Sequence, residues 1–221
     1  MTYQHSVFSA APPPISRAAL KTECWYVIES RNGYIYKGVK EGVTPEAFRE
    51  AVEKDDVEQL VRRIDCRTGD FHFLPSGTVH ALGPGMVVAE VQTPSDTTYR
   101  VTDWGRGREI HVDLSMRCIH FEPACDEAPG AEGETLLVTE FFTVARRSAG
   151  AGDEVALPQG RCSALMMLNA DEPARVRHAG DVEPQIFLRP GDTLLLPARL
   201  EGPSLAASSP CEWLEITLPE G

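Results

Sequence analysis

A short stretch of this sequence occurs twice, and it constrains the fold more than any other feature. Gly69–Pro75 reads Gly-Asp-Phe-His-Phe-Leu-Pro, and Gly191–Pro197 reads Gly-Asp-Thr-Leu-Leu-Leu-Pro. Each copy predicts a Gly-Asp turn, a four-residue strand and a proline at the same offset. Two copies of one β-unit predict two β-barrel lobes. A histidine, His80, follows the first copy but none follows the second. We therefore expect a functional site in the first lobe and a structural role for the second.

Charge and cysteine content exclude several classes of protein. The net charge of −12 argues against nucleic-acid binding, which demands a basic face. An anionic substrate would need a local basic cluster working against this average field. Six cysteines are scattered without a CxxC pair, and no export signal or apolar membrane span is visible. These features predict reduced thiols, a cytoplasmic location and no membrane partner.

The chain divides into segments of different composition. Residues 1–20 contain a proline tract and predict a poorly defined lead-in; residues 21–123 predict the site-bearing lobe. Within that lobe, Thr44 as N-cap and Pro45 at the first helical position predict a helical insert over about 44–64. The insert is expected to end in a second short helix around Val57–Val61, with Arg62 and Arg63 near its end. Residues 124–134 are interpreted as a linker, and 135–221 as a second, metal-free β-lobe.

Several motifs resemble one enzyme family. Gly69-x5-Pro75-x-Gly77-x2-His80 resembles the second sequence motif of the cupin superfamily. The stretches Lys-Thr-Glu-Cys-Trp-Tyr (21–26), Ser-Asp-Thr-Thr-Tyr-Arg-Val (95–101) and Asp-Trp-Gly-Arg (103–106) resemble class I phosphomannose isomerase in its short bacterial form. The resemblance runs from about residue 21 to the C-terminus. It implies an all-β protein with two cupin-like, jelly-roll barrels in tandem and a small helical insert.

The resemblance also implies a chemistry and a set of site residues. The activity would be a zinc-dependent interconversion of mannose 6-phosphate and fructose 6-phosphate through an enediol, with one Zn²⁺ per chain. The implied zinc ligands are His5, Glu23 and His80, although the residues around His5 do not match the family segment. The implied catalytic residues are Arg100, Lys21 and Glu90.

Each of these residues also has a structural alternative. His5 would then be a terminal histidine without a ligand role, Lys21 a solvated lysine, and Glu90 a group that orients a ligand or an arginine. Arg100 would be an ion-pair partner of Asp96 or Asp103. Structural roles are also assigned to the six cysteines and to four histidines: His72, His111, His120 and His178.

The family's usual chain has more sequence upstream, so two further interpretations stay open. The chain would be a truncated or decayed, non-catalytic cupin that binds a sugar phosphate, or a metal-dependent cupin with different chemistry, such as an oxygenase. The run Ser95–Val101 argues against the oxygenase. A first barrel short of strands would have an exposed edge, so the protein is expected to be a monomer or a homodimer paired across that edge.

Overall fold

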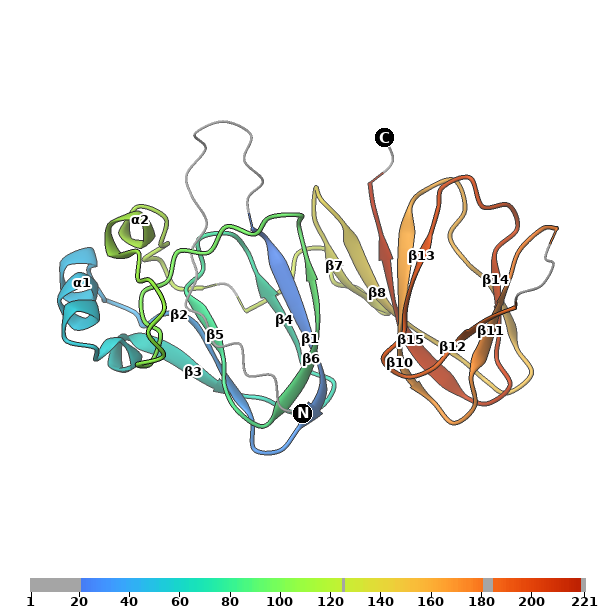
Figure 1. Ribbon diagram of the computed structural model, residues 1–221, viewed down its shortest axis with the longest axis horizontal. Coiled ribbons are helices and arrows are strands. Elements are labelled where there is room, and N and C mark those ends of the chain that lie inside the picture. The colour runs from blue at the N-terminus through green and yellow to red at the C-terminus, as the bar shows by residue number, and fades with distance from the viewer. Residues whose placement is uncertain (1–20, 125, 181–184, 220–221) are drawn as a thin grey trace. The chain divides into compact units, whose positions relative to one another are not determined.

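The computed structural model describes residues 21–124, 126–180 and 185–219 and contains β-strands with a few short helices (Figure 1). The chain divides into two compact units, with the boundary between residues 126 and 127. The described residues of each unit form two antiparallel sheets, so the predicted all-β architecture of two tandem barrels is confirmed. None of the described helices is long and apolar enough to cross a membrane.

In the first unit, the six strands that the structure describes pair into two three-stranded sheets, in the orders β4-β1-β6 and β3-β2-β5. The strands are β1 (Glu23–Ser30), β2 (Tyr34–Val39), β3 (Val61–Asp65), β4 (Phe71–Leu74), β5 (His80–Leu82) and β6 (Met86–Gln92). Trp25 and Val27 of β1 pack with Ile35 of β2 and Leu74 of β4, so one core joins both sheets. Side chains that point inward from either sheet therefore meet in the same interior.

The helical insert begins where the sequence predicts. The N-cap Thr44 accepts a hydrogen bond from the Ala47 N–H at 3.2 Å, and helix α1 (Pro45–Glu53) has Pro45 in its first turn. The expected second helix is only a 3₁₀ turn, η1 (Val57–Leu60), and strand β3 follows it directly. The prediction that Arg62 and Arg63 end a helix is therefore wrong. Pairing of β3 with β2 takes this segment into the sheet.

A second short helix, α2 (Val112–Met116), contacts α1. The largest core of the first unit includes Phe48 and Val52 from α1 together with Val79, beside His80, and Val101, beside Arg100. The insert therefore shares its core with the segments that carry two of the predicted site residues.

The second unit contains a five-stranded sheet in the order β13-β10-β15-β8-β7 and a four-stranded sheet in the order β12-β11-β14-β9. Its strands are β7 (Thr135–Val138), β8 (Thr143–Ala149), β9 (Glu154–Ala156), β10 (Ser163–Ala170), β11 (Ala174–Arg177), β12 (Ile186–Leu188), β13 (Thr193–Leu196), β14 (Ser204–Ala206) and β15 (Cys211–Thr217). Leucine, methionine and Trp213 side chains from both sheets form its core.

The sequence repeat is also a repeat of backbone structure. Gly69 and Gly191 both have positive φ, 92° and 90°, which favours glycine at this turn. The Gly69 N–H donates to the Val27 carbonyl oxygen, and the Gly191 N–H donates to that of Met167. Strands β4 and β13 then pair antiparallel with β1 and β10, with Glu23 opposite Leu74 and Ser163 opposite Leu196. Glu23 of the first unit thus corresponds to Ser163 of the second.

Candidate functional site

Glu23 and His80 meet in the interior of the first unit. Glu23 begins β1 and His80 begins β5, so they come from different sheets. Both are buried, with 1% and 6% of their surface exposed. The His80 Nε2 atom lies 2.7 Å from Glu23 Oε1, and the Trp25 ring packs edge-on against the imidazole at 5.3 Å. We call these two residues the Glu23–His80 pair.

The hydrogen bond of His80 Nδ1 determines which ring nitrogen of His80 faces Glu23. His80 Nδ1 lies 2.8 Å from the Thr78 carbonyl oxygen, which can only accept a hydrogen bond. Nδ1 therefore carries a proton, and Nε2 is the ring nitrogen that faces the Glu23 carboxylate. Among the described residues, the buried atom Glu23 Oε1 has no hydrogen-bond partner of regular geometry. An imidazole nitrogen and a carboxylate oxygen that converge in this way can both ligate a divalent cation, and a backbone carbonyl behind the imidazole is the usual support for such a ligand.

Lys21 and Glu90 lie beside the Glu23–His80 pair. The Lys21 ammonium is 3.1 Å from the other oxygen of Glu23, Oε2. Glu90, on β6, lies across from Trp25 of β1, and its carboxyl shares a hydrogen bond with that of Glu23. Glu90 is exposed to solvent. Four of the six predicted site residues are therefore brought together.

The surroundings shift the pKa values of the two carboxyls in opposite directions. Burial alone would raise the pKa of Glu23, but the His80 ring, the hydrogen bond with Glu90 and the Lys21 ammonium lower it to about 2. Protein atoms around the Glu90 carboxyl limit its hydration, and together with the adjacent Glu23 carboxylate they raise its pKa to about 7. Glu23 is therefore ionised at neutral pH, as a metal ligand must be.

Arg100 lies on the loop after β6, and no contact joins it to the Glu23–His80 pair among the described residues. One guanidinium nitrogen donates to the Glu109 carbonyl oxygen at 3.0 Å, and its backbone N–H donates to His111 Nδ1 at 3.3 Å. Neither aspartate considered as its ion-pair partner pairs with it in the part of the chain described. His5 lies outside the described residues.

Three arginines form a local basic cluster on this loop. Burial and the charges of Arg100 and Arg106 lower the pKa of Arg108. Asp103 orders the turn by accepting hydrogen bonds from the Gly105 and Arg108 backbone N–H groups at 3.0 and 2.6 Å. Because like charges repel, such a cluster is better satisfied by an anion than by solvent alone.

Lys37 is a candidate that the sequence analysis missed. It lies on β2 directly opposite His80, has 1% of its side chain exposed, and places its ammonium 3.9 Å from the Asp126 carboxylate. Its charge also reaches His72, whose pKa it helps to lower. The alternation Ile35, Lys37 along β2 was the available signal, because residues two apart share a face of a strand.

The chain is similar to mannose-6-phosphate isomerases in sequence and in fold. It is 36% identical over 136 residues to the mannose-6-phosphate isomerase of Streptococcus mutans, covering 56% of this chain and 43% of that protein. It is 36% identical over 139 residues to mannose-6-phosphate isomerase ManA of Bacillus subtilis, covering 59% of this chain and 44% of that protein. The matched part of the chain thus spans a little under half the length of either relative.

The structural comparison covers nearly the whole chain. The crystal structure of mannose 6-phosphate isomerase from Bacillus subtilis superposes with a TM-score of 0.78 and 25% identity, covering 96% of this chain and 71% of that one. A zinc-bound mannose 6-phosphate isomerase shares the fold with a TM-score of 0.70 and 14% identity, covering 98% of this chain and 76% of that one. No protein-family model matches the sequence.

Proposed function

Since the chain is homologous to the mannose-6-phosphate isomerases over the part of their length that it spans, we propose that it is a zinc-dependent aldose–ketose isomerase. The substrates would be mannose 6-phosphate and fructose 6-phosphate. The observation that carries the proposal is the Glu23–His80 pair, in which a buried carboxylate oxygen and an imidazole nitrogen converge. The named activity of the homologues supplies the substrate class.

Glu23 and His80 would hold the zinc ion, with His5 as the third protein ligand. Two imidazoles and one carboxylate leave coordination positions open for substrate. When bound, zinc would supply a Lewis acid that polarises the sugar oxygens at C1 and C2. The Lys21 ammonium, fixed at Glu23 Oε2, would hold that carboxylate in place and keep it ionised.

The proton transfer between C1 and C2 needs a group beside the sugar that can both accept and donate. Glu90 suits this role by position, because it is hydrogen-bonded beside Glu23 and open to solvent. It would take the proton from C2 of the aldose and return it to C1 of the enediol, with the O–H protons redistributed between the two oxygens. Arg100 would contribute its permanent charge to the enediol or the phosphate, together with Arg106 and Arg108.

The second unit would play a structural part only. In the second unit, the position that corresponds to Glu23 is Ser163. Between Pro197 and strand β14 there is no histidine that could correspond to His80. One zinc ion per chain is therefore proposed for the catalytic site. We further propose a cytoplasmic protein that acts as a monomer or a homodimer.

The test is conversion of mannose 6-phosphate to fructose 6-phosphate by the purified 221-residue chain, with and without a chelator. Zinc-dependent turnover is expected, and the variant His80→Ala should lose both turnover and bound zinc. His178→Ala, in the second unit, is the matched control and should keep both. A folded, zinc-loaded chain that binds the sugar phosphate without converting it would refute the isomerase and favour the non-catalytic binding protein.

A separate variant tests the proton-transfer role. Glu90→Gln keeps the size of the side chain but removes the group that exchanges a proton. We expect kcat to fall by about 10²- to 10⁴-fold with a much smaller change in KM, since positioned acid–base groups contribute factors of this size. Unchanged kcat would remove Glu90 from the mechanism without affecting the zinc assignment.

A further inference from the structure

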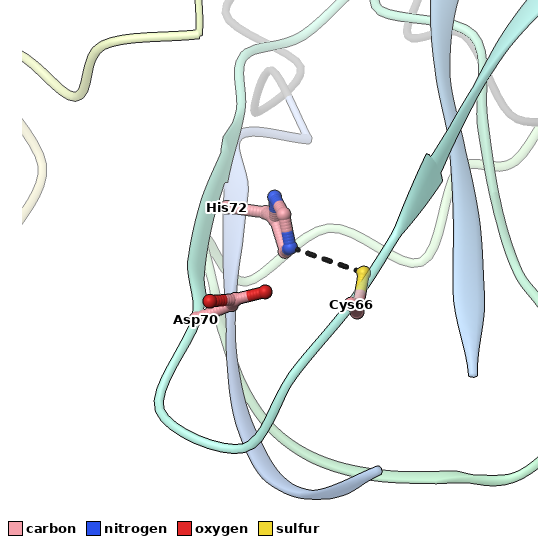
Figure 2. A group of neighbouring side chains, drawn as sticks. All are labelled: Cys66, Asp70 and His72. Atoms are coloured by element: carbon pink, nitrogen blue, oxygen red, sulfur yellow. Dashed lines mark hydrogen bonds between the residues drawn. The ribbon is translucent and has the colours of Figure 1, made fainter. Parts of the chain in front are cut away.

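A second group of metal-binding side chains lies in the first unit, away from the Glu23–His80 pair. The Cys66 thiol, the Asp70 carboxylate and the His72 imidazole all place a ligand atom within 4.8 Å of one another. Figure 2 shows the three side chains pointing toward a common point, with Cys66 Sγ 3.3 Å from His72 Nε2. We call these three residues the Cys66 cluster.

We propose that the Cys66 cluster is a binding site for a thiophilic divalent cation, Zn²⁺ in particular. Zinc–sulfur and zinc–imidazole bonds of about 2.3 and 2.0–2.1 Å at a tetrahedral angle place the two ligand atoms roughly 3.5 Å apart. The observed sulfur–nitrogen distance is already close to this value. Thiolate, imidazole and carboxylate together form a ligand set that zinc accepts, with one position left for water.

The three ligands come from one short, well-anchored stretch of chain. Cys66 follows β3, His72 lies on β4, and the turn between them is held by hydrogen bonds from the Gly69 N–H to the Val27 carbonyl and from the Cys66 N–H to the Gly33 carbonyl. Asp70 uses one oxygen, Oδ2, to accept the Arg67 N–H at 2.7 Å. This hydrogen bond fixes the aspartate in the turn, and a carboxylate oxygen of Asp70 lies within 4.8 Å of the thiol and the imidazole.

The repeat shows that the fold itself does not require these residues. The positions that correspond to Cys66, Asp70 and His72 in the second unit are Leu188, Asp192 and Leu194. Asp192 accepts the Arg189 N–H at 2.8 Å, as Asp70 accepts that of Arg67, so the aspartate has a turn-forming role in both units. The thiol and the imidazole, in contrast, are replaced by two leucines in the same local structure.

A cation can reach two of the three cluster residues through a cavity. Cys66 and Asp70 line this cavity of about 680 Å³, together with Ser30 and Thr68. Burial raises the pKa of the Cys66 thiol to about 11, so a bound cation must displace the thiol proton. The cluster is also distinct from the proposed catalytic site. In the pairing of β1 with β4, His72 lies opposite Trp25. Glu23 lies two residues before Trp25 along β1, opposite Leu74.

Cobalt provides a direct test, because Co²⁺ replaces zinc and gives a thiolate-to-metal charge-transfer absorption only when a cysteine ligates it. The full chain, freed of metal by dialysis against a chelator, is titrated with Co²⁺ alone. We expect this absorption to appear and to saturate at one ion per chain. Cys66→Ser should lose the absorption and one equivalent of bound cobalt. Cys118→Ser, a buried cysteine of the same unit, is the matched control and should keep both.

Two further variants make the outcome decisive. His72→Gln should weaken cobalt binding at the cluster, and it keeps the proposal testable if Cys66→Ser fails to fold by circular dichroism. His80→Ala should retain the thiolate absorption, since it removes a ligand of the other site only. Absence of the absorption in the unmodified chain, or its persistence in Cys66→Ser, would overturn the proposal. Neither result would bear on the isomerase, which rests on Glu23 and His80.

Discussion

The helical insert offers the sharpest test of how the first unit is held together. Phe48 of α1 has none of its surface exposed, and its ring packs edge-on against Phe121 at 5.7 Å. The same core includes Val79, next to His80, and Val101, next to Arg100. Removing the Phe48 ring should therefore destabilise the unit that carries the site, and not the helix alone.

The expected cost of Phe48→Ala is about 3–5 kcal/mol in the free energy of unfolding. This figure combines lost burial of the ring with the cavity left behind, and about 0.5–1.5 kcal/mol of it belongs to the aromatic pair with Phe121. Domains are stable by only about 5–15 kcal/mol, so the loss is a large fraction of the total. Helix α1, with nine residues, is too short to persist without this packing.

Urea unfolding, with hydrogen exchange of the β2 and β5 amides, measures the effect. Exchange at both strands should accelerate in Phe48→Ala by a factor that corresponds to the same free energy. Phe48→Leu, which keeps much of the volume, should cost less than about 1.5 kcal/mol. Glu53→Ala, on the exposed side of α1, should change little. A loss below about 1 kcal/mol in Phe48→Ala, with unchanged exchange in β5, would refute the shared core.

Three other changes have expected outcomes. Thr44→Ala removes the N-cap oxygen of α1 and should cost about 1 kcal/mol, seen as a lower urea midpoint; an unchanged midpoint would contradict the capping role. Hydrogen bonds from the Arg108 and Gly105 N–H groups lower the pKa of Asp103, so its stabilisation is present above the unfolded pKa and is lost as pH falls through the folded one. Asp103→Asn should therefore lower the melting temperature at neutral pH, and the difference should shrink in acid rather than persist. Burial raises the pKa of the Cys24 thiol to about 12, so iodoacetamide at neutral pH should alkylate the partly exposed Cys162 well before Cys24, as peptide mass spectrometry would show; equal rates would contradict the burial of Cys24.

Local patterns in the sequence predicted those parts of the protein that local forces decide. The Gly-Asp turns at Gly69 and Gly191 require a positive φ, and strands of the expected length follow both. At the start of α1, the Thr44 side chain accepts a hydrogen bond from a backbone N–H of the first turn, and Pro45 has no N–H that needs a partner. By contrast, the segment after Val57 looked helical from its apolar spacing, but pairing with β2 made it a strand.

The site was only partly accessible from the sequence. Motif resemblance pointed to Glu23, His80, Lys21 and Glu90, which the structure brings together; the roles proposed for them, and for Arg100 and His5, remain predictions. The alternation of Ile35 and Lys37 along β2 was the only sequence signal that Lys37 points inward, and its place opposite His80 depends on strand pairing. Cys66 and His72 were assigned structural roles, because their proximity is visible only once β3, β4 and the turn between them are folded.

The sequence by itself therefore determined the β-repeat, the turns, the helix start and the residues that resemble a known family, because each depends on neighbours along the chain. The tertiary structure decided which side chains share an interior. Strand register places Trp25 opposite both His72 and Glu90, and the meeting of two sheets brings His80 to Glu23. Pairing across a sheet and between sheets joins residues distant in sequence, and a change of one residue in register would turn each of these side chains to the opposite face.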